Sequence, residues 1–260
     1  MSDFERAVEI VHDALRGLRE NGVELRASSL SLEHLVSTPR AVTPQIGVSA
    51  DGRSNAERLA EIRGPILACT KCPHLVRSRT QVVFGVGNPD AELMFVGEAP
   101  GEDEDIKGEP FVGKAGELLT KIIVAMNFRR EDIYIANVLK CRPDMPTGES
   151  GNRKPRPEEM QTCLPYLRKQ IEIIRPRAIV ALGATAMLGL TGDGSPMSKL
   201  RGRWHEFASI PLMATYHPAY LLRNQSLTEK RKVWEDMLLV LERLGKPISE
   251  KQRGFFLSRI

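Results

Sequence analysis

Apolar, strand-like runs alternate with helical segments along most of this 260-residue chain, and this alternation limits its fold more than any other feature. The apolar runs are short, and the segments between them carry apolar residues at helical spacing. Such alternation predicts an α/β protein with a four-stranded, mostly parallel sheet and helices on both faces. The predicted strands are 92–97, 132–138, 178–183 and 210–216, and the predicted helices are 114–128, 157–174, 184–190 and 227–245.

The two ends of the chain differ in composition from its middle. Apolar residues recur at helical spacing near the N-terminus, which predicts an amphipathic helix within residues 1–24. Residues 25–59 are rich in Ser, Thr, Pro and Gly, so we expect a flexible linker there. One folded domain is expected over residues 60–245, followed by a disordered tail over 246–260. A competing interpretation is that one of the termini, for example KQRGFFL in the tail, docks onto a replication or repair protein.

The composition is that of a soluble globular protein, with 42% hydrophobic and 27% charged residues. The first residues carry acids and bases throughout, so they do not resemble a signal peptide. No uncharged apolar run reaches the length of a membrane span. These features predict a cytoplasmic protein, which we expect to be a monomer. The formal net charge of +4 slightly favours a polyanionic partner such as nucleic acid.

Three polar loops directly follow predicted strands. They contain GEAPG, NVLKCRP and TYHPAYLL. Ligands bind at the carboxyl ends of strands in parallel α/β sheets, so we expect these loops to meet at one edge. The first loop continues as GEAPGEDED, which places five carboxylates within residues 97–105. Three interpretations of this acidic run are a solvated loop, a Mg²⁺ site and a catalytic pocket.

The chain has four cysteines, Cys69, Cys72, Cys141 and Cys163. Each lies in a predicted loop or near a helix end, beside Pro, Lys or Arg. A disulfide framework is not expected in a cytosolic protein, and unrelated buried thiols are the simplest alternative. Four thiolates favour one four-ligand site, which holds either zinc or an iron–sulfur cluster. At a zinc site His74 could replace one cysteine, and the spacing alone leaves both metals open.

The motifs CTKCP, VGEAPGEDEDIKGEPFVGKAG, NVLKCRP and HPAYLLR occur in this order over residues 60–245. Together they resemble the motifs of the family 4 uracil-DNA glycosylases, the iron–sulfur, thermostable type. The resemblance implies a three-layer α/β/α sandwich of the uracil-DNA glycosylase type and a 4Fe-4S cluster on the four cysteines. It also implies hydrolysis of the N-glycosidic bond of flipped-out deoxyuridine in single- or double-stranded DNA. That reaction releases uracil, leaves an abasic site and begins base excision repair.

The resemblance assigns roles to individual residues. Phe111 is the expected platform on which uracil stacks. Asn137 presents a donor beside an acceptor, which match O4 and N3–H of uracil, whereas cytosine presents the reverse pattern. His217 is expected to hydrogen-bond O2 of uracil and to stabilise the developing anion. Glu104 is the expected carboxylate that positions water or stabilises the cationic sugar. The other predicted substrate-binding residues are Gly97, Glu98, Ala99, Pro100 and Gly101; Ala99 stands where other families of the superfamily have a water-activating aspartate.

Apolar and basic residues near these motifs are candidates for contact with DNA. Leu221 or Leu222 in HPAYLLR could wedge into the stack that the base leaves, although the first turn of a buried helix explains them equally well. Arg223, Lys140 and Arg142 are the candidates for holding phosphates.

The segment DMPTGESGNRK, residues 144–154, departs from the family pattern and resembles an insertion between the third and fourth cysteines. A related branch of the superfamily traps its product covalently through a His in an extra basic segment. GEDEDIKGEPFVG contains no such segment, so covalent trapping is not expected here. One alternative function is a non-catalytic iron–sulfur DNA-binding module of the same fold, and another is a metal-dependent nuclease that uses the acidic run.

Overall fold

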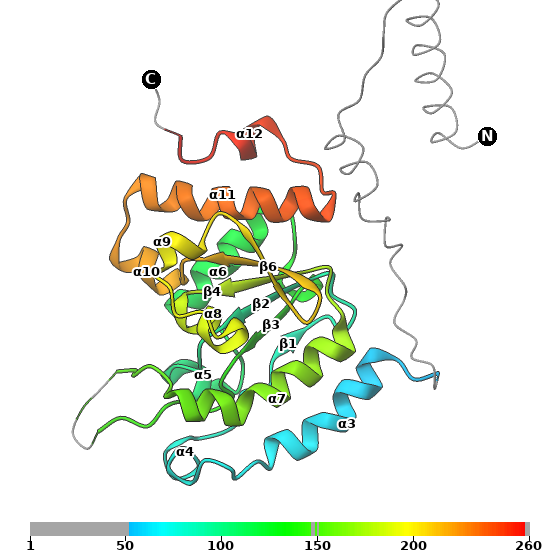
Figure 1. Cartoon of the computed structure of the whole chain (residues 1–260), viewed down its shortest axis with the longest axis vertical. Helices are drawn as coiled ribbons and strands as arrows, with labels where there is room; N and C mark the ends of the chain where they lie inside the picture. The colour runs from blue at the N-terminus through cyan, green and yellow to red at the C-terminus, as the bar shows by residue number, and fades with distance from the viewer. Residues whose placement is uncertain (1–51, 147–148, 150, 258–260) are drawn as a thin grey trace, which may run out of the picture. The chain divides into compact units, whose positions relative to one another are not determined.

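The computed structural model describes residues 52–146, 149 and 151–257 (Figure 1). Four parallel strands form the centre of its sheet, in the order β3-β2-β4-β6. They are β2 (Leu93–Gly97), β3 (Tyr134–Asn137), β4 (Ala178–Leu182) and β6 (Ile210–Thr215). The α/β class and the four strands predicted from the sequence are therefore confirmed.

The sheet has six strands, however, and not four. β1 (Val86–Gly87) and β5 (Trp204–Phe207) pair antiparallel with β3 and β6 at the two edges. The sequence did not predict β1 because it is only two residues long. It did not predict β5 because the turn to β6, Ala208–Ser209, has φ values of 51° and 62° without the Asn or Gly that usually marks such a turn.

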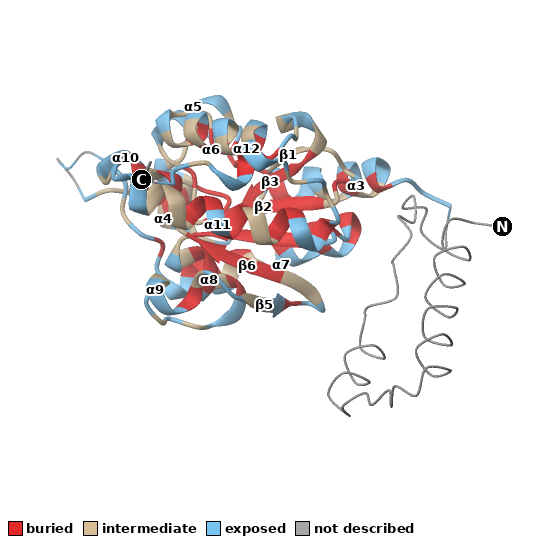
Figure 2. Ribbon diagram, turned by 90° about the horizontal axis from the view of Figure 1, so that it is seen from above, coloured by how far each residue is buried: buried red, intermediate tan, exposed pale blue. Residues whose placement is uncertain are grey.

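Helices cover both faces of the sheet (Figure 1). On one face α3 (Asn55–Leu67), α7 (Pro157–Ile174) and α8 (Ala184–Thr191) pack against the same side of the strands. On the other face lie α6 (Lys114–Ala125) and α11 (Leu227–Leu244). The side chains of β2 alternate between these two clusters, and Figure 2 shows the strands buried between exposed helix surfaces. The predicted three layers are confirmed.

Short helices occupy the connections between these elements. They are α4 (Pro73–Ser78), α5 (Glu102–Lys107), η1 (Arg130–Asp132), α9 (Met197–Leu200), α10 (Pro218–Arg223) and α12 (Glu250–Arg253). Two of them, α5 and α10, begin a few residues after the carboxyl ends of β2 and β6 and thus shape the loops there. None of the helices in the described ranges is both long and apolar enough to cross a membrane.

The linker was predicted to extend to residue 59, but α3 already begins at Asn55. The Ser54 hydroxyl accepts the N–H of Glu57, and the Glu57 carboxylate accepts the N–H of Ser54. This reciprocal cap has a sequence signature, S-x-x-E, which SNAE displays and the prediction overlooked. The predicted helix within 1–24 and most of the linker lie outside the described residues.

The prediction of a disordered C-terminal tail is corrected for residues 246–257, which include α12. The Gln252 carbonyl accepts a hydrogen bond from Trp234 Nε1 at 2.6 Å, and its side-chain amide donates to the Ala125 carbonyl at 2.9 Å. Phe255 packs on the Trp234 ring with 5.1 Å between centroids. Two residues of KQRGFFL thus belong to the folded domain and are not free to dock onto a partner.

Candidate active site

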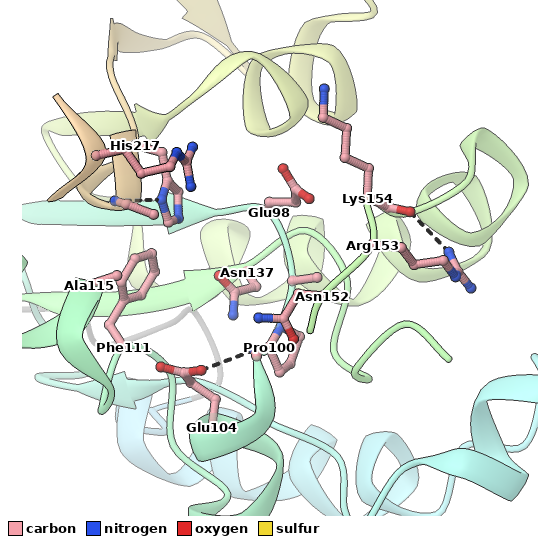
Figure 3. Close-up of a pocket in the computed structure, with 14 residues that line it drawn as sticks. Glu98, Pro100, Glu104, Phe111, Ala115, Asn137, Asn152, Arg153, Lys154 and His217 are labelled. Carbon is pink, nitrogen blue, oxygen red and sulfur yellow. Dashed lines mark hydrogen bonds between the residues drawn. The ribbon is translucent and has the colours of Figure 1, made fainter. Parts of the chain in front are cut away.

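A cavity of about 360 Å³ lies at the carboxyl ends of β2, β3 and β6 (Figure 3). The three polar loops predicted to converge do meet here. Nine predicted site residues line the cavity: Glu98, Ala99, Pro100, Gly101, Glu104, Phe111, Asn137, His217 and Arg223. Five others were not among the predicted site residues, although two of them, Arg153 and Lys154, belong to a basic segment, 140–156, that the sequence predicts to hold phosphates: Ala115, Asn152, Arg153, Lys154 and Ala219.

Phe111 forms one wall of the cavity in a strained but well-supported conformation. Its φ of 56° is left-handed, which is rare for a bulky residue. Gly116, at the start of α6, permits this because any Cβ there would overlap the Phe111 carbonyl. The Phe111 ring is buried and lies 5.5 Å from the His217 ring, at 32° to it. A flat ring can therefore stack on Phe111 beside the imidazole.

Asn137 ends β3 and is only 2% exposed. Its Oδ1 atom is buried and has no hydrogen-bond partner among the described residues. A buried acceptor without a partner costs about 1–3 kcal/mol. A ligand that donates a hydrogen bond to Oδ1 would remove this penalty, which makes Asn137 the clearest recognition group in the cavity.

His217 follows β6 and caps α10, and its Nδ1 accepts the N–H of Ala219 at 3.1 Å. In a neutral imidazole the proton then sits on Nε2, which is free to donate to a ligand. Burial, and after it the positive charge of Arg223, lowers the pKa of His217 to about 4, although Glu104 opposes the change. The side chain is thus a neutral hydrogen-bond donor at physiological pH.

This lowered pKa predicts how the His217 ring responds to acid. Its Cε1–H resonance in an NMR titration should stay constant between about pH 8 and pH 5, because an ordinary histidine titrates near 6.5 and this one only near 4. A midpoint near the ordinary value would show that burial does not lower the pKa of His217, and an appreciable fraction of the rings would then be protonated near pH 7.

Glu104 joins two loops of the site. Its Oε2 accepts the N–H of Gly101 at 3.0 Å, and its Oε1 accepts those of Val112 at 3.0 Å and Gly113 at 3.1 Å. These bonds tie the start of α5 to the segment that follows Phe111. A carboxylate has about four acceptor positions, so one remains for water. Glu104 therefore orders the cavity wall as well as lining it.

Other acids of the run GEAPGEDED point to different neighbours. Asp105 is buried and accepts the N–H of Thr80 at 2.8 Å, while Glu102 lies 3.5 Å from Arg142. Glu98 faces the cavity, and burial raises its pKa against the lowering effect of a Thr185 hydrogen bond. Among the described residues, no three of the five carboxylates in 97–105 have oxygens all within 4.8 Å of one another, so they do not gather around one point as a Mg²⁺ site requires.

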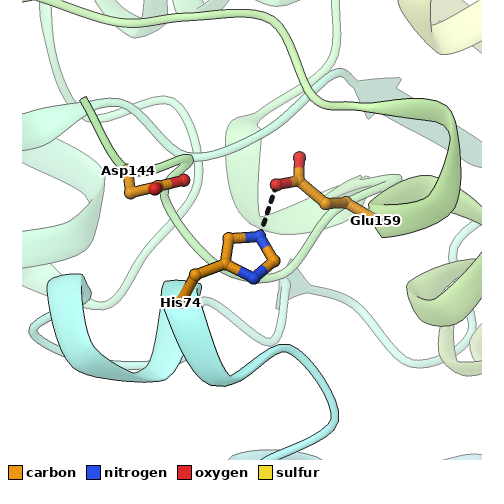
Figure 4. Close-up of side chains that lie close together, drawn as sticks. All are labelled: His74, Asp144 and Glu159. Atoms are coloured by element: carbon orange, nitrogen blue, oxygen red, sulfur yellow. Dashed lines mark hydrogen bonds and ion pairs between the residues drawn. The ribbon is translucent and has the colours of Figure 1, made fainter. Parts of the chain in front are cut away.

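One group of possible metal ligands does have its ligand atoms within 4.8 Å of one another: His74, Asp144 and Glu159 (Figure 4). Arg153 already neutralises both carboxylates, with Nη2 2.6 Å from Glu159 and in contact with Asp144. His74 Nε2 lies 2.7 Å from the same Glu159. This group is an ion-pair network that holds residues 152–154 at the cavity. His74 is thus engaged there, which corrects its prediction as a possible replacement for a cysteine ligand.

The structure brings the four cysteines together from the loops before α4 and after β3 and from α7. Burial raises the pKa of Cys72 and of Cys163, and in each case the neighbouring Cys141 and Cys69 raise it further. Three hydrogen-bond donors contact these sulfurs: Arg79 on Cys141 at 3.0 Å, Tyr166 on Cys69 at 3.3 Å, and the Lys140 N–H on Cys163 at 3.2 Å.

Two of the five predicted DNA contacts, Lys140 and Leu221, are corrected. Lys140 is 1% exposed and donates through Nζ to Gln170 at 2.6 Å, so it cannot reach a phosphate. Arg142 donates to the Gly151 carbonyl at 3.0 Å within its own loop, and because its side chain is 21% exposed its contact with DNA stays a prediction. Leu221 is buried at 4% because it faces the core from α10.

Leu222 and Arg223 keep their place at the surface. Leu222 is 38% exposed, and Arg223 is exposed and lines the cavity. Their accessibility suits a wedge and a phosphate contact.

Comparison with known proteins agrees with this architecture. The sequence model of the family described as "Uracil DNA glycosylase superfamily" matches residues 84–238 of this chain. The chain is 49% identical to the type-4 uracil-DNA glycosylase of Thermotoga maritima over 186 residues, which cover 70% of this chain and 92% of that protein. It is 44% identical to the type-4 uracil-DNA glycosylase of Archaeoglobus fulgidus over 182 residues, which cover 67% of this chain and 88% of that protein. The chain therefore belongs to the uracil-DNA glycosylase superfamily and, within it, to the type-4 family.

Proposed function

We propose that this protein is a uracil-DNA glycosylase, which cleaves the N-glycosidic bond of deoxyuridine in DNA and leaves an abasic site. The observation that carries the proposal is the buried, unpartnered Oδ1 of Asn137, in a cavity between the Phe111 ring and His217. Uracil has a flat ring for Phe111 and an N3–H donor for this acceptor.

In the proposed reaction the flipped-out base stacks on Phe111 while Asn137 binds its N3–H and O4. The bond between base and sugar breaks, so the base becomes an anion and the sugar an oxocarbenium-like cation. The neutral His217 donates from Nε2 to O2, where the negative charge collects, and so stabilises the anion. Glu104 stabilises the cationic sugar through its charge and orders one water with its remaining acceptor position. The oxygen of that water bonds to C1′ of the sugar, and the proton that the water releases neutralises the uracil anion.

We further propose that the four cysteines hold a 4Fe-4S cluster. Buried thiols with raised pKa values, such as Cys163 at about 12, lose their protons when a metal binds. Arg79 and Tyr166 donate to the sulfurs and so offset the charge of bound thiolates. The cluster supplies no redox step to a hydrolysis; it ties the loop at 69–72 to the segment between Cys141 and Cys163.

The spacing of the sulfurs favours a cluster over zinc. Within the described ranges the cysteines form no group of three with sulfurs all within 4.8 Å of one another. A tetrahedral zinc ion with ligands at about 2.3 Å would hold its sulfurs only about 3.8 Å apart. A cluster holds its four cysteines at separate corners and thus accommodates the wider arrangement.

The proposed partner is uracil-containing DNA, single- or double-stranded, which a monomeric cytoplasmic enzyme would bind. Leu222 would enter the space that the base leaves, and Arg223 and Lys154 at the cavity mouth would contact the flanking phosphates. Residues 1–51 remain candidates for contact with a repair or replication protein.

The test uses protein purified without exposure to air and an oligonucleotide that carries one deoxyuridine. After incubation in excess EDTA and treatment with alkali, we expect strand cleavage at the deoxyuridine, and none with an Asn137→Ala/His217→Ala double variant. Cleavage that depends on added Mg²⁺ would indicate a nuclease instead. No cleavage by folded, cluster-bearing protein would indicate a DNA-binding module that does not catalyse.

Gly97→Ala should abolish most of this activity. A Cβ at this position would lie 2.6 Å from Phe111 Cζ and would overlap Asn137 Oδ1, so both recognition groups would shift. Misplacement by about 1 Å can cost roughly a hundredfold in rate, which single-turnover assays would measure. Gly194→Ala is the control because its Cβ would meet no atom nearer than 3.8 Å. Full activity of the Gly97 variant would show that the base does not bind between these two residues.

A further inference from the structure

A buried ion pair lies beneath the end of β6, between α11 and the turn before β5. The Asp236 side chain on α11 is fully buried and accepts from Arg201 at 2.8 Å through Oδ1 and at 3.2 Å through Oδ2. Arg201 also donates to the Lys232 carbonyl of the same helix. The Thr215 hydroxyl completes this Asp236 cluster by donating to Asp236 Oδ2 at 2.7 Å.

The cluster acts on the residues directly before His217. Thr215 is the last residue of β6, and its carbonyl accepts the N–H of Gly183 at 2.8 Å. Gly183 has a φ of 96°, and a Cβ there would lie only 3.2 Å from the Cβ of His217. The guanidinium of Arg201 lies 5.9 Å from the centre of the Tyr216 ring. The Asp236 cluster therefore contacts both residues that precede His217, Thr215 through its hydroxyl and Tyr216 through its ring.

The cost of this arrangement argues that it does more than join two elements. Burial raises the pKa of Asp236 to about 6, against the lowering effect of Thr215 and Arg201. Buried ion pairs are often no more stabilising than apolar residues of the same size. They do define a single geometry, because each polar group must find its partner. A catalytic donor needs its position defined to within about half an ångström.

We propose that the Asp236 cluster is a positioning device for His217: it fixes the end of β6 and the Tyr216 ring so that Nε2 of His217 stays in place in the cavity. Asp236, Arg201 and Thr215 do not touch the base in this arrangement. They act through the backbone of residues 215–217. The proposal rests on the proposed function, since the rate it concerns is that of uracil excision.

The test compares Thr215→Val, which keeps the shape and removes the donor, with Thr215→Ser, which restores the hydroxyl. Thr191→Val is the matched control, because Thr191 donates to the Met187 carbonyl at 2.8 Å in α8, away from the cavity. For the wild type and each variant we would measure kcat and KM for uracil excision and the position of the His217 Cε1–H resonance. All measurements are made well below the Tm of the variant. Arg201→Lys is a second variant, which keeps the positive charge but loses the bidentate hydrogen bond to Asp236.

We expect Thr215→Val and Arg201→Lys to lower kcat about tenfold with KM unchanged, since a small misplacement of a catalytic group weakens mainly the transition state. The His217 resonance should shift in both variants and not in Thr191→Val, and Thr215→Ser should restore both readings. If a variant has a lower Tm but an unchanged kcat and an unchanged His217 resonance, the Asp236 cluster only stabilises the fold and does not position His217. If the wild-type protein excises no uracil, the proposed function fails, and the His217 resonance alone decides this inference.

Discussion

His217→Ala is expected to slow uracil excision by roughly 10² to 10³-fold, the effect of removing one preorganised donor to a developing anion. The Nδ1 bond to Ala219 holds the imidazole with Nε2–H toward the ligand, and burial keeps the ring neutral. The donor therefore needs no reorganisation when charge forms on the base. Single-turnover rates on an oligonucleotide with one deoxyuridine would measure the effect.

His205→Ala provides the matched control for this prediction. His205 lies on β5 and bonds to the Leu200 carbonyl at 2.8 Å, outside the cavity, so its loss should leave the rate unchanged. A His217→Ala variant as fast as the wild type would mean that the leaving base is stabilised elsewhere. Asn137 would then be the remaining donor to test.

Cys72→Ser is expected to remove the proposed 4Fe-4S cluster and, with it, most of the stability and DNA binding of the domain. A structural metal centre contributes its binding free energy to folding, and Cys72 is one of only four thiols in the chain. The segment between Cys141 and Cys163 carries Arg153 and Lys154, which line the cavity. Losing its anchor should therefore loosen one wall of the site.

The expected readings for Cys72→Ser are loss of the brown colour, a lower Tm and weaker binding to DNA. Thr70→Ala, an exposed change between Cys69 and Cys72, should keep all three. A folded, fully active Cys72→Ser protein would refute a structural role for the cluster. Fe and acid-labile sulfide analysis of the wild type would separate a cluster from zinc.

The acidic run shows how much of the site local sequence can predict. The motif order placed nine of the fourteen residues that line the cavity, because each follows a strand whose end is recognisable. The motif order did not show that the Glu104 carboxylate accepts hydrogen bonds from the backbone N–H groups of Gly101, Val112 and Gly113. The bond to Gly101 is a local contact at the start of α5, but Val112 and Gly113 lie eight and nine residues away across a left-handed turn, which no local pattern encodes.

Long-range contacts also overturned predictions that charge and composition supported. Lys140 follows a strand beside a cysteine, as a phosphate-binding residue would, yet it is buried and donates to Gln170. Asn152 and Arg153 lie in the segment that resembles an insertion, and only the network with His74 and Glu159 brings them to the cavity.

By itself the sequence determined the layered α/β fold, its four parallel strands, the four cysteines and the loops that carry Phe111, Asn137 and His217. These follow from periodicity and from motif order, which are local properties of a chain. Only the tertiary structure decided which charged side chains face the cavity, that Leu222 and not Leu221 is exposed, and that Asp236 lies beneath the end of β6. Burial and hydrogen-bond partners come from segments distant in sequence, and they exist only once the layers have packed.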